Sequence, residues 1–314
     1  MTSARSGARP GDGRSSRDRP SRYEYATVRL TFRSGGERCV GRLYRPDRPS
    51  SPPAVVLAGG PIAAGGRPLR SYAERLAAAG YAVFGFDFRH AGDSDGEPRN
   101  LVSPPRQRAD WEAALAGLRG RGDVATDSVL LWGAGLAARG ALDVAADDPR
   151  VAGVVAQTPI LSGRAFLRDR GLRFLAGGLL AGVRDRLQSP VVGPHRLPVV
   201  DDEAGSRLAL VSTAGASRRY RTLADEGWDN RTPARSILSL WRDTGDADRT
   251  RPTCPVLLVG GTHDDVTDVE AVAETLPDAT LVRLPAGHLD LYDGRGFERC
   301  LRHGLAFLDA TERR

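Results

Sequence analysis

The chain has 314 residues, enough for one large domain or two small ones, and 40% of them are hydrophobic, as in an ordinary globular protein. It holds no run of about 18 apolar residues that would predict a membrane-spanning helix, and no apolar segment near its start that would indicate a secretory signal. The three cysteines lie far apart and suggest neither a disulfide framework nor a metal site, so we expect a cytoplasmic protein without a membrane partner.

The net charge of +6 raises the question of nucleic-acid binding. Residues 1–22 hold six Arg against two Asp, a net charge of +4, which leaves +2 for the rest of the chain. No basic helix, and no basic strand with interleaved aromatic residues, is found, so we expect no nucleic-acid partner. All 45 cationic residues are arginine. This bias indicates a GC-rich genome, such as that of an actinobacterium.

The first part of the chain predicts a tail followed by alternating strands and helices. Residues 1–22 are rich in Ser, Arg, Gly and Pro and have almost no apolar side chains, so we expect them to be disordered. The predicted strands that follow are 24–33, 39–45, 53–58, 81–87, 128–132 and 151–156, and the predicted helices are 70–79, 105–119 and 136–147. Such alternation is typical of βαβ units around a mostly parallel sheet.

The alternation stops in the middle of the chain and then resumes. Residues 158–250 hold only amphipathic pieces, near 164–187 and 217–224, and are too long for a simple connection. We interpret them as a helical lid inserted above the sheet. The core then comprises residues 23–157 and 251–314. Its last predicted elements are strands 255–260 and 279–284 and helices 267–276 and 296–310.

One segment has the pattern of a catalytic turn without its catalytic side chain. Residues 129–142, VLLWGAGLAARGAL, predict an apolar strand, a sharp glycine-rich turn and a helix. This is the setting of the nucleophile elbow, Gly-x-Ser-x-Gly. Gly133 takes the first glycine position, Gly135 the nucleophile position and Ala137 the last position. The elbow therefore offers no side chain that could attack a substrate.

Around this elbow the chain resembles the α/β-hydrolase superfamily, in its dienelactone-hydrolase-like and polyketide-transferase-like branch. The other segments that carry the resemblance are 80–99 (GYAVFGFDFRHAGDSDGEPR), 148–159 (DPRVAGVVAQTP), 255–266 (PVLLVGGTHDDV) and 285–294 (PAGHLDLYDG). Together they cover about residues 24 to 310. The resemblance implies an α/β-hydrolase fold, with helices on both faces of a mostly parallel sheet and an inserted helical lid.

The resemblance also implies a catalytic pair, with Asp264 matching the triad acid and His288 the triad histidine. The chain order of elbow, acid and histidine is that of the fold. Histidine titrates near neutrality and suits proton transfer, and a carboxylate on its other ring nitrogen fixes its tautomer. Both residues follow predicted strands, at the sheet edge where such folds bind ligands. Asp265 is the alternative acid, and the register of the motif favours Asp264.

A second departure from the family concerns the oxyanion hole. The family usually has a His-Gly pair at the end of the first parallel strand, followed by a residue that donates its N–H. Here Gly59, Gly60 and Pro61 stand in that place, and proline has no N–H to donate. The backbone N–H of Leu136, at a helix start, is the expected remaining donor, and Ile62 is a candidate to replace Pro61.

Two interpretations of Gly135 stay open at the level of sequence. The glycine could simply relax a strained turn, or it could make room beneath His288 for a bulkier substrate atom. Gly60 and Pro61 are expected to line the pocket. The lid aromatics Tyr220 and Trp228 could line it against a flat substrate, although such residues are as often packing.

These observations favour a non-hydrolytic enzyme. The Asp264–His288 pair would carry out acid–base chemistry, namely C–C bond formation or cleavage, cyclisation or elimination, on a polyketide-like intermediate. The alternatives are a hydrolase that activates water directly against activated esters or lactones, and a binding protein without chemistry. We expect an apolar or aromatic small-molecule substrate, no cofactor and no metal, and the chain could act as a homodimer. Arg89, His90 and Asp93 are interpreted as structural.

Overall fold

The computed structural model describes residues 23–60, 67–202, 208–213, 215–225, 228–245 and 251–313. The tail expected to be disordered, residues 1–22, lies outside these ranges, as do Pro61 and Ile62.

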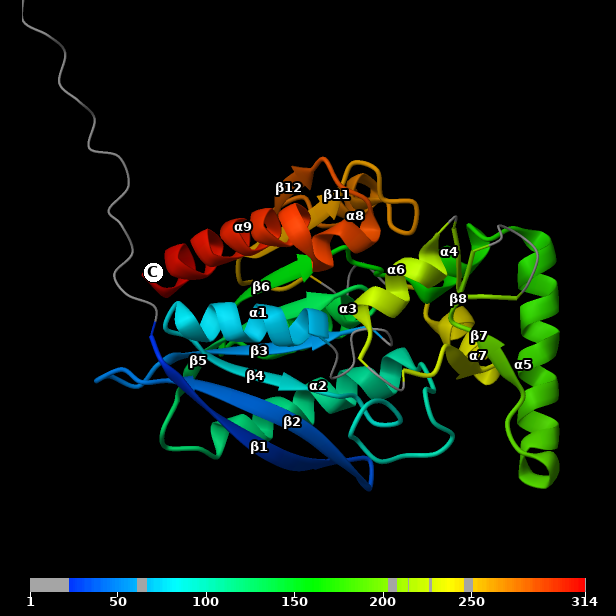
Figure 1. The fold of residues 1–314 in the computed structure, drawn as a ribbon, viewed down its shortest axis with the longest axis horizontal. Coiled ribbons are helices and arrows are strands. Elements are labelled where there is room, and N and C mark those ends of the chain that lie inside the picture. Colours follow the sequence, from blue (N-terminus) through cyan, green and yellow to red (C-terminus); the bar gives the residue numbers. More distant parts are fainter. Residues whose placement is uncertain are drawn as a thin grey trace, which may run out of the picture.

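An eight-stranded sheet forms the centre of the molecule, in the order β1-β2-β4-β3-β5-β6-β11-β12 (Figure 1). β1 pairs antiparallel with β2 and β2 with β4, and the other neighbours are parallel. The strands are β1 (Tyr25–Ser34), β2 (Glu37–Pro46), β3 (Pro53–Gly59), β4 (Ala82–Phe86), β5 (Ala125–Ala134), β6 (Val151–Gln157), β11 (Val256–Gly261) and β12 (Thr280–Leu284).

Helices cover both faces of the sheet. α1 (Arg67–Ala78) and α9 (Gly294–Glu312) pack on one face, and α2 (Pro104–Arg119), α3 (Ala137–Asp147) and α8 (Val269–Thr275) pack on the other. Successive residues of β3 show why the strand is a continuous apolar run. Val55 and Leu57 pack with α1 and α9, whereas Ala54 and Val56 pack with α2, α3 and α8. Both faces of the strand therefore need apolar side chains. The predicted α/β fold is confirmed.

A long segment joins β6 to β11, and we call it the inserted segment. Figure 1 places it beyond the ends to which the arrows of the parallel strands point. Its elements are α4 (Gly163–Arg168), α5 (Leu172–Val192), β7 (Arg196–Pro198), β8 (Val200–Asp201), β9 (Val211–Ser212), α6 (Ala216–Leu223), β10 (Arg231–Pro233) and α7 (Arg235–Arg242). It has an apolar core of its own, which Leu136 of the sheet edge joins.

The inserted segment differs from the sequence prediction in three ways. Four short strands, β7 to β10, accompany its helices and were not predicted. The amphipathic piece 164–187 is two helices, because the chain turns at Gly171, whose φ of +87° suits glycine. α5 then continues through Pro190 to Val192. α7 was not predicted, although it has the same length as α6, which was.

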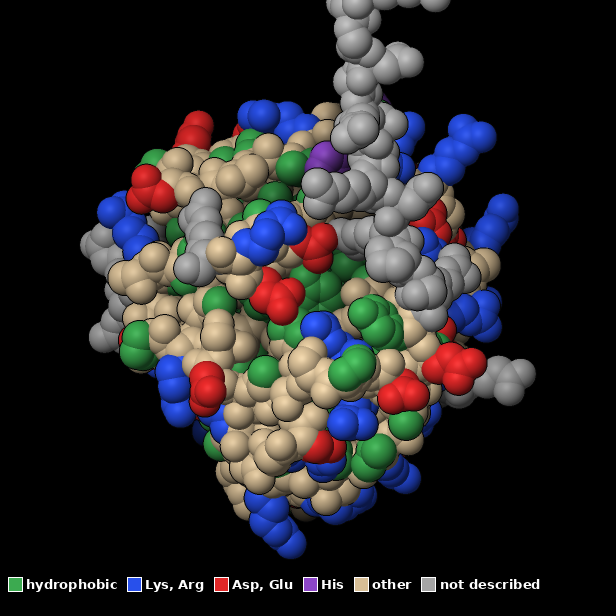
Figure 2. Space-filling view, turned by 90° about the vertical axis from the view of Figure 1, so that its left-hand side faces the viewer, with side chains coloured by type: hydrophobic (Ala, Val, Ile, Leu, Met, Phe, Trp, Pro, Cys, Tyr) green, Lys and Arg blue, Asp and Glu red, His purple; other side chains and the backbone are tan. Residues whose placement is uncertain are grey.

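α5 is covered on one side only. Gly178, Ala181 and Gly182 are buried, whereas Leu180 and Leu187 are more than 70% exposed. None of the described helices has the length and apolarity needed to span a bilayer. At the opposite end of the molecule, Figure 2 shows arginine and acidic side chains interspersed over the surface, without a patch of one sign.

Candidate active site

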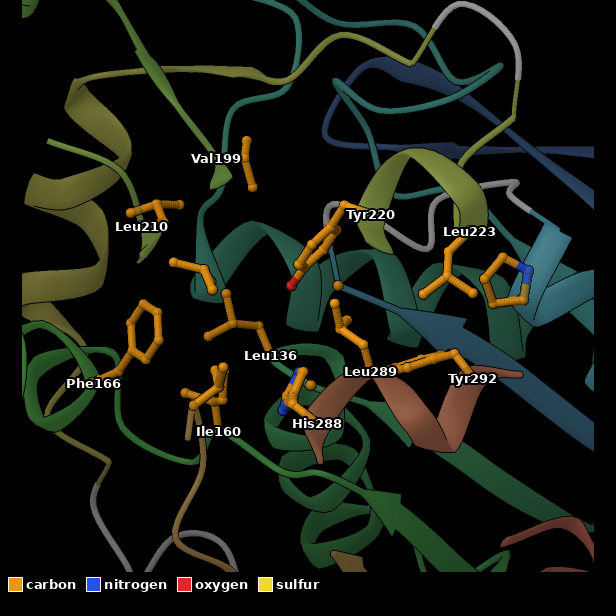
Figure 3. Close-up of a pocket in the computed structure, with 15 residues that line it drawn as sticks. Leu136, Ile160, Phe166, Val199, Leu210, Tyr220, Leu223, His288, Leu289 and Tyr292 are labelled. Carbon is orange, nitrogen blue, oxygen red and sulfur yellow. The ribbon is translucent and has the colours of Figure 1, made fainter. Parts of the chain in front are cut away.

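A pocket of about 630 Å³, part of it open to solvent, lies between the sheet edge and the inserted segment (Figure 3). Ten of its fifteen lining residues are apolar: Pro68, Leu136, Ile160, Phe166, Val199, Leu210, Val211, Leu223, Val266 and Leu289. The others are Gly60, Gly135, Tyr220, His288 and Tyr292. This composition is that of a site for an apolar small molecule with a few placed polar groups.

The structure brings the predicted pair together. Asp264 follows β11, and His288 begins a short 3-10 helix, η2 (His288–Tyr292), after β12. His288 Nδ1 lies 2.9 Å from Asp264 Oδ2 and 3.1 Å from Oδ1. The carboxylate is fully buried and the imidazole is 8% exposed. With Nδ1 directed at Asp264, Nε2 is the ring nitrogen available to a ligand in the pocket.

Backbone donors hold the Asp264 carboxylate in place. Its Oδ1 accepts hydrogen bonds from the N–H groups of Val266 and Thr267, each at 2.8 Å. These bonds fix the orientation of the carboxylate, which in turn orients the imidazole of His288. Asp265, the alternative acid, makes no hydrogen bond or ion pair to His288 among the described residues.

The turn predicted as the elbow is present, and the space beside Gly135 is open. Gly135 lies in the turn between β5 and α3 with φ +61°, and a Cβ atom added there would meet no atom within 4 Å. At Gly133 the same addition would lie 2.6 Å from Ala138 Cα. The turn therefore requires glycine at the first position because helix and strand touch there. At Gly135, backbone conformation favours glycine, but space does not require it.

Of the two expected oxyanion donors, Leu136 lies among the described residues and Ile62 does not. The Leu136 N–H stands at the start of α3 and makes no backbone hydrogen bond among the described residues. A Cβ on Gly60 would lie 3.8 Å from this nitrogen, so the Leu136 nitrogen lies beside Gly60. The Gly60 N–H itself donates to Ala134 O at 3.1 Å. Pro61 and Ile62 lie outside the described residues.

The lid aromatics take different places. Tyr220, on α6, lines the pocket and is 1% exposed. Trp228 does not line it but stacks behind Tyr220, with ring centroids 6.1 Å apart and an interplanar angle of 16°. Sequence reasoning missed Tyr292, although it lies four residues after His288 in the same motif. It also missed Phe166, Val199 and Leu210, which no sequence signal separates from ordinary packing residues.

The loop after β4 lies outside the pocket. The Arg89 guanidinium pairs with the buried Asp110 carboxylate at 2.6 Å, and Asp93 pairs with Arg29 at 3.3 Å. His90 Nε2 lies 2.7 Å from an Arg106 nitrogen. None of these residues lines the pocket. Among the described residues, no group of three His, Cys, Asp or Glu side chains is arranged to hold a metal ion.

A family model and several known proteins match the chain. The model of the family Hydrolase_4, described as serine aminopeptidase S33, matches residues 50–294. The quorum-quenching protein AidA of Acinetobacter baumannii is 30% identical over 290 residues, which are 90% of this chain and 94% of that protein. The polyketide transferase af380 of Aspergillus fumigatus is 28% identical over 239 residues, covering 73% of this chain and 80% of its own.

Solved structures match over nearly the whole chain. The structure of DcsB in complex with its substrate analogue superposes with a TM-score of 0.78 at 23% identity, covering 91% of this chain and 100% of that one. The α/β-hydrolase GrgF from Penicillium sp. sh18 gives a TM-score of 0.76 at 21% identity, covering 91% and 99%. At this identity the likeness concerns the fold alone.

Proposed function

We propose, since the chain belongs to the Hydrolase_4 family of α/β-hydrolases, that it is a small-molecule enzyme working without a covalent nucleophile. In this proposal, Asp264 and His288 carry out acid–base chemistry on an apolar substrate held in the pocket. One observation carries the proposal. The buried Asp264–His288 pair is intact, while the nucleophile position beside it is Gly135, with open space where a side chain would stand.

Proton transfer is the chemistry that remains when the nucleophile is absent. Nε2 of His288 can take a proton from a carbon next to a substrate carbonyl, and the Asp264 carboxylate stabilises the imidazolium that forms. The electron pair of the broken C–H bond moves into an enolate. The enolate carbon attacks a second carbonyl of the same molecule, a C–C bond forms, and the imidazolium returns its proton to the new alkoxide. Elimination uses the same first step.

The relatives support the substrate class. Two of them are named polyketide transferases, and both align over more than two thirds of this chain. Polyketides carry repeated carbonyl groups with acidic C–H bonds between them. A histidine base can remove such a proton without the help of a covalent nucleophile. The apolar lining of the pocket suits the carbon skeleton of such a molecule. In this proposal the inserted segment acts as a lid that separates the reacting carbons from water.

Ortho-acetylphenylacetone provides a direct test, because its intramolecular aldol reaction and loss of water give a methylnaphthol. The first readout is exchange of its α-protons in heavy water, followed by NMR, and the second is the fluorescent naphthol. We expect wild type to accelerate the exchange and His288→Ala to lose the acceleration by a factor of about 10²–10⁴. Equal exchange rates in wild type and His288→Ala would overturn the proposal.

Hydrolysis by direct activation of water is the second candidate. It is favoured by the relatives named as thiohydrolases, two of which match parts of this chain, and by the Leu136 N–H as a single oxyanion donor. This candidate predicts His288-dependent cleavage of p-nitrophenyl esters and no labelling by fluorophosphonates, which need a serine. Ester cleavage without α-proton exchange would favour this candidate over the first.

A further inference from the structure

The pocket contains a tyrosine hydroxyl that the proposed mechanism has not used. Among the lining side chains, only His288, Tyr220 and Tyr292 carry polar atoms. His288 is bonded to Asp264, and the Tyr292 hydroxyl lies 3.4 Å from Thr158 Oγ1. No hydrogen bond joins the Tyr220 hydroxyl to a described residue, and its side chain lines the pocket. A hydroxyl in a pocket without a protein partner is available to a ligand oxygen, which is therefore its expected partner.

Figure 3 shows the Tyr220 hydroxyl pointing into the pocket, toward the side where Leu136 and His288 lie. The packing around α6 keeps it there. Arg219, the preceding residue, forms an ion pair with Asp290 of η2 at 2.6 Å. Behind the ring, Trp228 stacks on Tyr220. The helix that carries Tyr220 is therefore tied to the 3-10 helix that carries His288.

We infer that the Tyr220 hydroxyl donates a hydrogen bond to a carbonyl oxygen of the substrate, and so makes this pocket selective for apolar ketones over hydrocarbons of the same shape. This inference rests on the proposed function for the identity of the reacting carbonyl. When the neighbouring C–H bond loses its proton to His288, negative charge develops on that oxygen. A donor already placed there stabilises the transition state more than the ground state.

The protonation state of Tyr220 agrees with a donor role. Burial, followed by the nearby Tyr292 and Asp264, raises the pKa of Tyr220 well above its usual range. The hydroxyl therefore keeps its proton at neutral pH. It can donate to an oxygen but cannot itself act as the base, which leaves that role to His288.

Binding of two uncharged probes tests the inference without any turnover. β-Acetylnaphthalene has a carbonyl, and β-ethylnaphthalene has a similar shape without one. Quenching of tryptophan fluorescence gives both dissociation constants, because Trp228 adjoins the Tyr220 ring. We expect wild type to bind the ketone about tenfold more tightly, the value of one hydrogen bond of ordinary strength. In Tyr220→Phe, the two constants should become equal within about twofold.

Tyr292→Phe is the matched control, because it removes a hydroxyl of the same pocket that already has Thr158 as a partner. It should keep the preference for the ketone. The infrared carbonyl stretch of bound acetylnaphthalene should shift to lower wavenumber in wild type and not in Tyr220→Phe. His288→Ala should keep the preference for the ketone while losing α-proton exchange. The ketone preference therefore tests the inference about Tyr220, and α-proton exchange separately tests the proposed function. Equal affinities in wild type, or a preference that survives in Tyr220→Phe, would overturn the inference.

Discussion

The sheet edge and the inserted segment build two walls of one pocket, and they contribute different groups to it. On the sheet side, backbone hydrogen bonds hold the groups in place. Gly60 N–H donates to Ala134 O at 3.1 Å, and Gly135 N–H donates to Gln157 O at 2.9 Å. On the other side, Phe166, Val199 and Leu210 present apolar side chains to the pocket, and their backbone N–H groups also donate hydrogen bonds, to Ser162 O, Asn230 O and Pro198 O. We therefore expect the sheet edge, which carries His288, to supply the acid–base chemistry, and the apolar side chains of the inserted segment to decide which molecule enters.

The largest expected effect tests the chemical side of this comparison. Asp264→Asn keeps an oxygen that can accept from the N–H groups of Val266 and Thr267, so the fold should persist. It removes the charge that stabilises the imidazolium, and α-proton exchange should fall by about 10²–10⁴-fold. Circular dichroism provides the control for folding. A variant that exchanges as fast as wild type would show that the pair is structural.

Two neighbouring glycines sharpen the account of the elbow. Gly133→Ala should lower the free energy of unfolding by about 1–3 kcal/mol or more, because its methyl group would overlap the Ala138 backbone, which has little freedom to move. Gly135→Ala should cost only about 1–2 kcal/mol, the strain of a left-handed backbone with open space around it. Urea titration measures both. Equal losses would contradict the view that space at Gly135 is free.

Gly135→Ser adds a chemical readout at the same position. The hydroxyl would enter the pocket that His288 lines, so we expect labelling by a fluorophosphonate that wild type does not show. The matched control is Gly135→Ala, which carries the same backbone strain without a nucleophile. Absence of labelling in a folded Gly135→Ser variant would mean that Nε2 of His288 does not reach this position.

Apart from Tyr220, the inserted segment should affect binding more than rate. Val199→Ala removes two methyl groups from the apolar wall, which lowers the affinity for an apolar ligand by up to about tenfold. The effect should appear in KM, with kcat nearly unchanged, since no reacting atom touches Val199. A fall in kcat with constant KM would place this wall among the groups that act in the transition state.

The smallest expected effect lies outside the pocket, in the pH dependence of stability. Burial, followed by Arg106, lowers the pKa of His90 from 6.5 to about 4, so acid destabilises the fold as pH falls through this range. Burial raises the pKa of Asp87 from 3.8 to about 6, which has the opposite sign over nearly the same range. The two slopes oppose each other in wild type. In Asp87→Asn, urea titrations should show stability falling more steeply between pH 6 and pH 4.

The fold was largely predictable because its signal is local. Each parallel strand is buried on both faces, so segments such as 53–58 and 151–156 are apolar runs that sequence alone reveals. The strand predicted at 128–132 proved longer, Ala125–Ala134, because Ala125 pairs with Pro53 at one end, and Gly133 and Ala134 pair with Ala58 and Gly59 at the other. The short helix α7 was missed, although α6, of the same length, was predicted.

The candidate site was predictable only where a motif carried it. Asp264 and His288 follow strands in a fixed order, and the structure brings them within hydrogen-bonding distance. Tyr220 was named from its aromatic character, and nothing in the sequence distinguished it from Trp228, which packs behind it. The direction of a side chain in the inserted segment depends on contacts between α6 and η2. Such contacts join residues about seventy positions apart, and local pattern does not encode them.

The connection between β6 and β11 has a consequence for how this protein can change. These strands are paired neighbours, yet the chain between Gln157 and Val256 builds a whole wall of the pocket. The entropy of closing a flexible loop grows only with the logarithm of its length, and doubling that length costs about 0.6 kcal/mol. Insertions and deletions in this connection therefore change the stability of the sheet only slightly. A lineage can reshape its substrate pocket by changing loop length while the acid, the base and their spacing stay as they are.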